Sequence, residues 1–309
     1  MSNKSTIADT VMMVEPIAFG FNESAAETNT FQIRVDQSSE EIQQKALQEF
    51  IDYVDLLRSH GITVEVFKDQ INPYTPDSIF PNNWFATSPH DRSFVTFPMA
   101  NKNRADERRE DIIHHLVSKN DYEIDQSLID YEAKGLFLEG TGSMVLDHIN
   151  NIAYACLSPR TDIDVFNHWC KQSGYEPVSF YSHGSDGTEV YHTNVIMSLA
   201  DEYVVICLES ILDDDEREMV IDKLVKISNR SIIDITMNQM NQFAGNMLQL
   251  RNKKGDKFLV MSKTAKDSLT TEQIEAITIT FKNTILEPDI TLIETIGGGS
   301  ARCMIAEIF

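Results

Sequence analysis

The segment GGGSARC at residues 297–303 combines a glycine run with a cysteine, and it suits a nucleophilic site. Glycines can take positive φ and let a substrate approach the backbone closely. Arg302 precedes Cys303, and a nearby cation favours the thiolate, which is the reactive form of cysteine. An arbitrary cysteine is more often a small core residue, but the glycine loop favours a nucleophile here. We interpret the cysteines that lie inside apolar strand or helix patterns as core residues: Cys156, Cys170 and Cys207.

A thiolate that attacks an sp² carbon needs an acid for the departing nitrogen and later a base for water. His192 can supply both functions. It precedes the apolar run NVIMS, while Glu139 lies between the apolar run GLFL and the turn GTG. A carboxylate in such surroundings needs a ligand or a cation. Either residue alone would more often be structural, but with Cys303 they predict a nucleophile, an acid/base and an anchor.

The elements that must position these residues recur about every fifty residues in the order strand, strand, amphipathic helix, strand. In the first unit, Ile112, Ile113 and Leu116 fall on one helical face. The units cover residues 79–119, 138–182, 193–236, 246–289 and, joined across the chain ends, 301–309 with 10–67. The pattern predicts an α/β ring with pseudo-fivefold symmetry, whose central pocket receives equivalent residues from different units. Since no linker interrupts the series, we expect a single domain over 1–309.

Composition narrows the classes of partner. The chain has 309 residues, 42% of them hydrophobic, and a formal charge of −22. Such acidity argues against nucleic acid or an anionic membrane and favours a cationic small molecule, although most of the charges can serve solubility alone. Four cysteines without C-x-x-C spacing predict neither a disulfide framework nor a metal site. Residues 1–16 lack a signal-peptide pattern, so we expect a cytoplasmic protein.

Taken together, DSIFPNN, LEGTG, HTN and GGGSARC resemble the guanidine-modifying enzymes of the pentein, or α/β-propeller, fold. That group comprises dimethylarginine dimethylaminohydrolases, arginine deiminases and glycine amidinotransferases. The sequence most resembles their amidinotransferase-like or citrulline-utilisation hydrolase branch. The resemblance covers essentially the whole chain, and the order Asp, Glu, His, C-terminal Cys is specific only in combination. It implies a five-bladed propeller built from strand-strand-helix-strand modules.

The resemblance also implies roles for single residues. Cys303 matches the nucleophile, His192 the general acid/base, and Glu139 the carboxylate that binds substrate or orients the histidine. Asp77 matches an acidic residue that holds the substrate's α-amino group.

Further residues match the substrate-binding part of the family pattern. Arg108 and Arg160 resemble the pair that grips the α-carboxylate, a task that suits the guanidinium fork. Phe80 and Trp84 are expected to wall the aliphatic stem of the substrate.

The sequence departs from the family pattern at three amides. Asn82 and Asn83 stand where relatives usually carry Glu-Asp, and Asn194 replaces the aspartate of an H-x-D motif. An amide offers a donor and an acceptor without charge, so it pairs better with a neutral ureido group than with a guanidinium. The departure predicts citrulline in preference to arginine.

The leading hypothesis is a cysteine hydrolase that converts citrulline to ornithine through a covalent thiol intermediate, without a metal or organic cofactor. The alternatives are arginine deiminase or dimethylargininase activity, amidinotransferase activity, and, in another class, a non-catalytic pentein binding protein. Thiol reactivity distinguishes the non-catalytic binding protein from the enzymes, because Cys303 of a binding protein would be an inert buried thiol. The expected partner is a small amino acid, and whether the chain forms a homodimer stays open.

Overall fold

The computed structural model describes residues 5–309, whose strands form five three-stranded sheets. In each sheet the first strand runs antiparallel to the middle strand, and the third strand runs parallel to it. A parallel pair needs a crossover connection, and here a helical segment provides it in every unit. The four N-terminal residues of the segment considered for a signal peptide lie outside the described residues.

The four units that are continuous in sequence follow the predicted order strand, strand, helix, strand. The first contains β3 (Phe85–Thr87), β4 (Ser93–Thr96), α3 (Glu110–Asn120) and β5 (Glu123–Asp125). The second contains β6 (Val145–Asp147), β7 (Ile152–Cys156), α5 (Ile163–Ser173) and β8 (Glu176–Phe180). The third contains β9 (Met197–Leu199), β10 (Tyr203–Ile206), α7 (Asp214–Asp222) and β11 (Ser231–Asp234). The fourth contains β12 (Leu248–Arg251), β13 (Lys257–Val260), α9 (Lys263–Ser268), α10 (Thr271–Glu275) and β14 (Thr284–Leu286).

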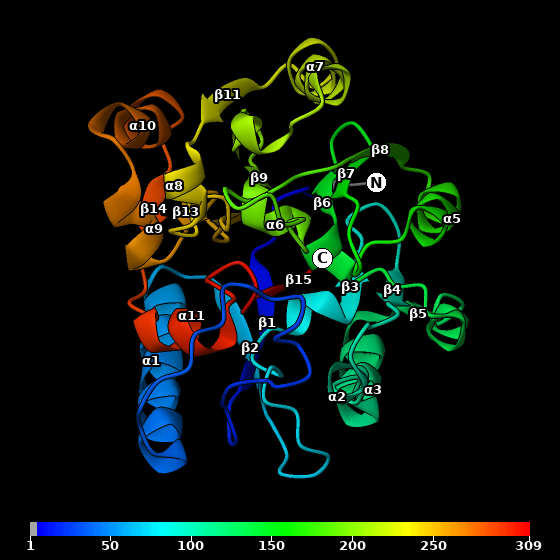
Figure 1. Cartoon of the computed structure of the whole chain (residues 1–309), viewed down its shortest axis with the longest axis vertical. Coiled ribbons are helices and arrows are strands. Elements are labelled where there is room, and N and C mark those ends of the chain that lie inside the picture. The colour runs from blue at the N-terminus through cyan, green and yellow to red at the C-terminus, as the bar shows by residue number, and fades with distance from the viewer. Residues whose placement is uncertain (1–4) are drawn as a thin grey trace.

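The fifth unit joins the two ends of the chain, as the sequence predicts. It contains β15 (Ala306–Ile308), β1 (Thr10–Glu15), α1 (Ser39–Ser59) and β2 (Thr63–Lys68). β1 pairs antiparallel with β15, with Met12 opposite Ala306, and parallel with β2. β15 contacts β3 of the first unit, β6 contacts β9, and β9 contacts β12. In Figure 1 the longer helices lie at the periphery, while β6, β9 and β15 lie near the middle.

Helix α1 shows how local sequence fixes an element and ties it to the nucleophile loop. Ser38 and Glu41 form a capping box that satisfies backbone N–H groups at the helix start. The helix buries one face, which includes Phe50 and Tyr53. The Tyr53 hydroxyl donates to the Ala301 carbonyl at 3.1 Å, so the helix holds the backbone two residues before Cys303.

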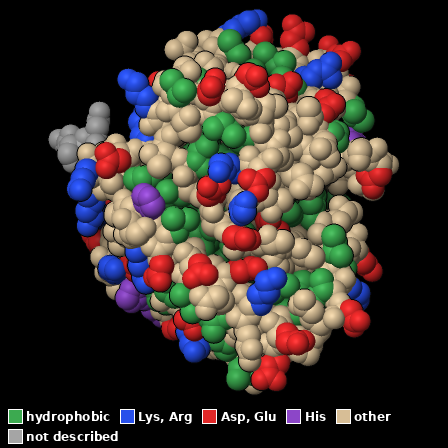
Figure 2. All heavy atoms as spheres, turned by 90° about the vertical axis from the view of Figure 1, so that its left-hand side faces the viewer, with side chains coloured by type: hydrophobic (Ala, Val, Ile, Leu, Met, Phe, Trp, Pro, Cys, Tyr) green, Lys and Arg blue, Asp and Glu red, His purple; other side chains and the backbone are tan. Residues whose placement is uncertain are grey.

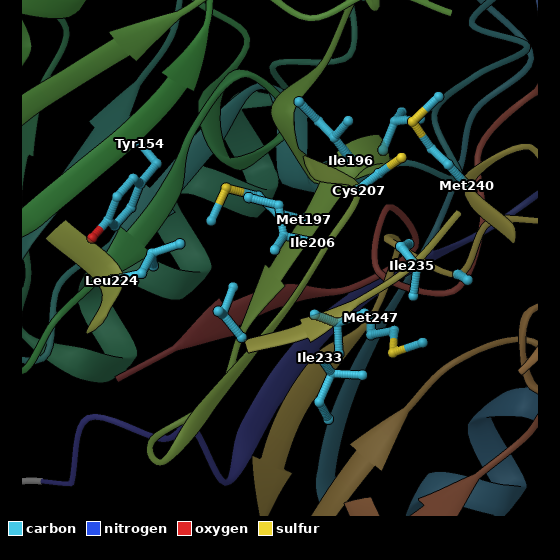
Figure 3. Close-up of a cluster of buried hydrophobic side chains, with 14 of the residues drawn as sticks. Tyr154, Ile196, Met197, Ile206, Cys207, Leu224, Ile233, Ile235, Met240 and Met247 are labelled. Carbon is cyan, nitrogen blue, oxygen red and sulfur yellow. The ribbon is translucent and has the colours of Figure 1, made fainter. Parts of the chain in front are cut away.

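One hydrophobic core cluster joins the second, third and fourth units and includes residues from all three strands of the third unit. Figure 3 shows Met197, Ile206, Ile233, Met240 and Met247, which come from the third unit and the turns beside it. Each fully buried side chain of this size contributes about 1.5–3 kcal/mol relative to an exposed one. This packing gives the short segments that precede the first strands a rigid support.

The acidic residues are distributed over the surface. On the face in Figure 2, Asp and Glu side chains are scattered among Lys and Arg.

Over residues 5–309, no helix has both the length and the apolar character needed to cross a bilayer. Two of the predicted helices end in π-helical turns, Lys223–Ile227 after α7 and Ala276–Thr280 after α10.

Candidate active site

The site is built from short helical turns that lie just before the first strand of a unit. Asn83 ends the 3₁₀ turn η1 (Pro81–Asn83), Glu139 is the N-cap of α4 (Gly140–Ser143), and His192 is the N-cap of α6 (Thr193–Ile196). α4 contacts both η1 and α6. The Thr193 hydroxyl donates to the Ser143 carbonyl at 2.6 Å, which joins α6 directly to α4.

His192 and Glu139 form a buried hydrogen-bonded pair. His192 Nε2 lies 2.8 Å from Glu139 Oε2, and the guanidinium nitrogen Nη1 of Arg160 lies 3.6 Å from the same oxygen. The Ala100 backbone N–H donates to Glu139 Oε1 at 3.0 Å. Burial alone would raise the pKa of Glu139, but Arg160 and His192 lower it well below its usual range. The carboxylate is therefore ionised and orients the imidazole.

His192 is neutral at neutral pH. Burial lowers its pKa to about 4, and the opposing effect of Glu139 does not restore the ordinary value, since Arg160 and Arg104 also disfavour a second positive charge. A neutral imidazole can accept a proton from a thiol or a water molecule.

Cys303 lies in the turn between α11 (Thr291–Gly297) and β15, and its side chain is 6% exposed. Its sulfur accepts hydrogen bonds from the side-chain amides of Asn194, at 3.4 Å, and Asn246, at 3.2 Å. At the other cysteines burial is the largest effect, and it raises the pKa of each to about 12: Cys156, Cys170 and Cys207.

A small cavity brings most of the predicted residues together. Its lining includes six of them: Asp77, Phe80, Asn83, Arg160, His192 and Cys303. Glu139 and Asn194 lie directly behind this lining, in contact with His192 and Cys303 respectively. The three glycines at 297–299, where the sequence predicts a close approach of substrate, line the cavity as well. Its other walls were not identified from the sequence: Asn29, Arg104 and Tyr191. Trp84 packs in the core instead, against Phe85 and Phe94.

The prediction for Arg108 needs correction. Its guanidinium forms a bidentate ion pair with Glu132, at 2.6 and 3.0 Å, and does not line the cavity. Arg104, four residues earlier, takes that place because the short helix α2 (Lys102–Ala105) turns it inward. It donates to both oxygens of Glu107 at 2.9 Å and to Asn83 Oδ1 at 2.8 Å. The Arg-x-x-Glu spacing was the available signal, since it suits a helical ion pair.

Burial and mutual attraction act in opposite directions on this ion pair. Burial raises the pKa of Glu107, while the charge of Arg104 and its hydrogen bonds to both carboxylate oxygens favour the ionised form. Attraction from the surrounding carboxylates outweighs desolvation at Arg104, so its pKa lies above the usual range and its charge is retained.

The two predicted specificity amides differ in position. Asn83 lines the cavity, and its Nδ2 lies 3.5 Å from the Glu139 carbonyl. Asn82 is fully buried outside the lining, and its carboxamide has no hydrogen-bond partner among residues 5–309. Only Asn83 is thus placed to contact a ligand. Gly142 makes this packing possible, since a Cβ there would come within 2.1 Å of Asn83 Nδ2 and 2.8 Å of the His192 ring.

A segment of irregular structure, residues 20–35, covers the cavity. Asn22 donates to the buried Asp77 carboxylate at 2.7 Å, and Arg160 donates to the Thr28 hydroxyl at 2.6 Å. Burial raises the pKa of Asp77, with Arg104 and Asn22 acting in the opposite direction. The Arg160 guanidinium also lies over the Tyr191 ring, 4.8 Å from its centroid. These contacts were missed because the covering segment carries no periodic pattern.

Over the described ranges, no group of three or more His, Cys, Asp or Glu side chains is arranged to hold a metal ion. The chemistry available at the cavity is that of a thiol, an imidazole and carboxylates.

The chain matches a family model and solved structures of known proteins. The family model of N,N-dimethylarginine dimethylhydrolase, eukaryotic, matches residues 15–309. Comparison with curated protein sequences returns no match.

Solved structures resemble the chain over nearly its whole length. The N-terminal domain of ArgZ, an arginine dihydrolase from the ornithine-ammonia cycle in cyanobacteria, is 17% identical with a TM-score of 0.73, covering 97% of both chains. AgrE in complex with L-arginine is 17% identical with a TM-score of 0.75, but only 40% of that longer chain is covered. The dimethylarginine hydrolase of Pseudomonas aeruginosa, complexed with citrulline, is 13% identical with a TM-score of 0.63, covering 97% of this chain and 99% of that one.

The structural likenesses show the mixed α/β fold with repeated small sheets. The chain spans about 40% of the full-length ArgZ and AgrE chains. Since the family model covers nearly the whole sequence, the chain belongs to the N,N-dimethylarginine dimethylhydrolase family within the guanidine-modifying, or pentein, superfamily.

Proposed function

We propose that the chain is a cysteine hydrolase that cleaves a C–N bond at the ureido or guanidino carbon of an arginine-type amino acid. The observation that carries this proposal is the convergence of Cys303 and the His192–Glu139 pair on one buried cavity. The five sheets also support a propeller-like single domain around that cavity. The names of the similar structures, arginine dihydrolase and dimethylarginine hydrolase, support the substrate class.

With citrulline, His192 takes the thiol proton and Cys303 attacks the ureido carbonyl carbon. The bond from that carbon to the ornithine nitrogen breaks while His192 returns the proton to the nitrogen, which leaves a carbamoyl thioester on sulfur. His192 then takes a proton from water, and the resulting hydroxide breaks the C–S bond. The products are ornithine and carbamic acid, which decomposes to ammonia and carbon dioxide. Glu139 stabilises the imidazolium formed in each half of the reaction.

The remaining lining residues fit the zwitterionic end of such a substrate. Arg160 and Arg104 are buried cations suited to an α-carboxylate, and Asp77 is a buried carboxylate suited to an α-amino group. Asp77 Oδ1 has no hydrogen-bond partner in the part of the chain described by the structure, so it can accept an N–H. Phe80 offers an apolar wall for the aliphatic stem.

The contacts of the buried carboxylates support citrulline. Glu139 already pairs with His192 and Arg160, and Glu107 with Arg104, so neither is free to neutralise a guanidinium. At the sulfur, Asn194 directs Nδ2 to Cys303, and within residues 5–309 its Oδ1 has no hydrogen-bond partner. Because Asn194 lies behind the lining, the amide that can meet the substrate is Asn83, which can pair with a neutral ureido group without the cost of burying a cation.

A second candidate is arginine dihydrolysis, in which arginine is converted to citrulline and then to ornithine. It is favoured by the likeness to ArgZ and AgrE, and AgrE is seen with L-arginine. The first step would release ammonia from the guanidino carbon and the second would use the chemistry described above.

A product screen over arginine, methylarginines, citrulline and agmatine tests the proposal. Ornithine from citrulline alone supports citrulline hydrolysis, and ornithine from both amino acids supports dihydrolysis. Citrulline that accumulates from arginine or methylarginine indicates a deiminase or dimethylargininase. Amidino transfer to an added amine indicates a transferase. Absence of turnover for every compound, with an unreactive Cys303, would favour a non-catalytic binding protein and reject the proposal.

A further inference from the structure

Asn246 lies in the turn before β12 and contacts the sulfur of Cys303, although it is not among the site residues predicted from the sequence. Its side chain is 1% exposed, and each of its polar atoms has a partner. Oδ1 accepts the Arg302 backbone N–H at 3.0 Å, while Nδ2 donates to the Asn194 carbonyl at 2.9 Å and to Cys303 Sγ at 3.2 Å.

These partners fix the orientation of the carboxamide. A backbone N–H can only donate and a carbonyl can only accept, so a flipped Asn246 would lose its bonds to both Arg302 and Asn194. The amide N–H therefore points at the sulfur. Together with the N–H of Asn194, it makes Cys303 Sγ an acceptor of two hydrogen bonds. Donors aimed at a sulfur favour its anionic form over the neutral thiol.

The backbone of Asn246 is also held in place. Gly245 has no room for a side chain, since a Cβ would come within 2.1 Å of the Val195 carbonyl oxygen in α6. Phe243 adopts a positive φ of 61°, which closes the turn. The turn is thereby packed against the helix that carries Asn194.

The pseudo-symmetry of the fold points to the same residue. Four units place one polar residue of the site shortly before their first strand: Asn83, Glu139, His192 and Cys303. The fourth unit in chain order has Asn246 at the equivalent place, two residues before β12. All five units then contribute a side chain to the same centre.

We propose that Asn246 is a positioning residue that holds the Cys303 sulfur and stabilises its thiolate. The proposal rests on the proposed function only in taking Cys303 as the nucleophile. Its consequence is measurable on the sulfur without any substrate, so the two can fail independently.

The test measures the pH dependence of Cys303 alkylation by iodoacetamide, in which the thiolate displaces iodide. In Asn246→Ala we expect the pH midpoint of Cys303 alkylation to rise and the alkylation rate at neutral pH to fall about tenfold or more. A change of about this size corresponds to the loss of one hydrogen bond to a charged group. Asn246→Asp, which keeps the size of the side chain, should show at least as large a change because it places an acceptor and a negative charge at the sulfur. Asn252→Ala is the matched control, since this buried asparagine bonds the His60 carbonyl at the other end of β12.

Thiolate absorbance in the ultraviolet gives a readout that needs no reagent access, as the difference between each protein and its Cys303→Ser counterpart. The other cysteines do not interfere at neutral pH, because burial raises the pKa of each to about 12. Unchanged midpoints in folded Asn246→Ala and Asn246→Asp would overturn the proposal, whatever the outcome of the substrate screen. Midpoints raised in both, with Asn252→Ala unchanged, would support it even if no tested compound is turned over.

Discussion

Gly142→Ala adds a single methyl group between two side chains of the site. Its Cβ would lie 2.1 Å from Asn83 Nδ2 and 2.8 Å from the His192 ring. Against an ordinary contact of 3.4 Å, the shortfall is about 1.3 Å at Asn83 and about 0.6 Å at His192 in a close-packed interior. Both side chains must therefore move, and with them the hydrogen bond from His192 to Glu139.

Misplacement of about 1 Å at reacting groups lowers rates on the order of 10²-fold, and an extra methyl group in a packed core costs about 1–3 kcal/mol. We expect Gly142→Ala to remain folded and to lose about 10²-fold in kcat/KM, measured as ornithine or citrulline release. Gly184→Ala is the control, because its Cβ would meet mainly the side chain of Asp186. A folded Gly142→Ala protein with kcat/KM within about twofold of wild type would refute the roles assigned to His192 and Asn83.

Four further outcomes are expected. Cys303→Ser should abolish product release and leave the free energy of unfolding nearly unchanged, as measured by denaturant titration, because serine is isosteric but far less ionised. Asn83→Asp should raise the ratio of kcat/KM for arginine to kcat/KM for citrulline, because a carboxylate pairs with a guanidinium. The rise will be limited because Arg104 already donates to the side chain at this position. An unchanged ratio in competition assays would show that Asn83 does not determine specificity. Because burial lowers the pKa of His192 to about 4, kcat/KM should stay level from pH 7 to about 5 and fall below that as the imidazole gains a proton. Between pH of about 6.5 and 4 the imidazole of His192 is protonated in the unfolded chain but not in the folded one. The free energy of unfolding of wild type should therefore decrease as the pH falls through this window. In His192→Gln the decrease, measured by urea titration, should be smaller.

The repeated units were predictable because buried strands and amphipathic helices leave a hydrophobic pattern in the sequence. The pairing of β1 with β15 follows from the same pattern, since an unpaired strand at each end implies a shared sheet. The residues Glu139, His192 and Cys303 were accessible to sequence reasoning because each stands beside a glycine turn or an apolar run where a reactive polar group is unusual.

The remainder of the site depends on side-chain direction, which hydrophobic pattern does not encode. Arg104 and Arg108 lie in the same charged segment, and only the course of α2 decides which one faces the cavity. Asn82 and Asn83 are neighbours, yet one lines the cavity and the other does not. Asn246 gave a weaker signal because an asparagine before a strand is common in turns. The covering segment 20–35 is placed by tertiary contacts such as Asn22 with Asp77.

Trapping the covalent intermediate tests most directly whether Cys303 is the nucleophile. The protein is incubated with citrulline or arginine, quenched in acid during turnover, and the peptide that contains Cys303 is weighed by mass spectrometry. With citrulline, we expect one carbamoyl group on Cys303, formed in wild type and absent from Cys303→Ser. Turnover without any adduct on Cys303, or an adduct on another residue, would contradict the assignment of this cysteine as the nucleophile.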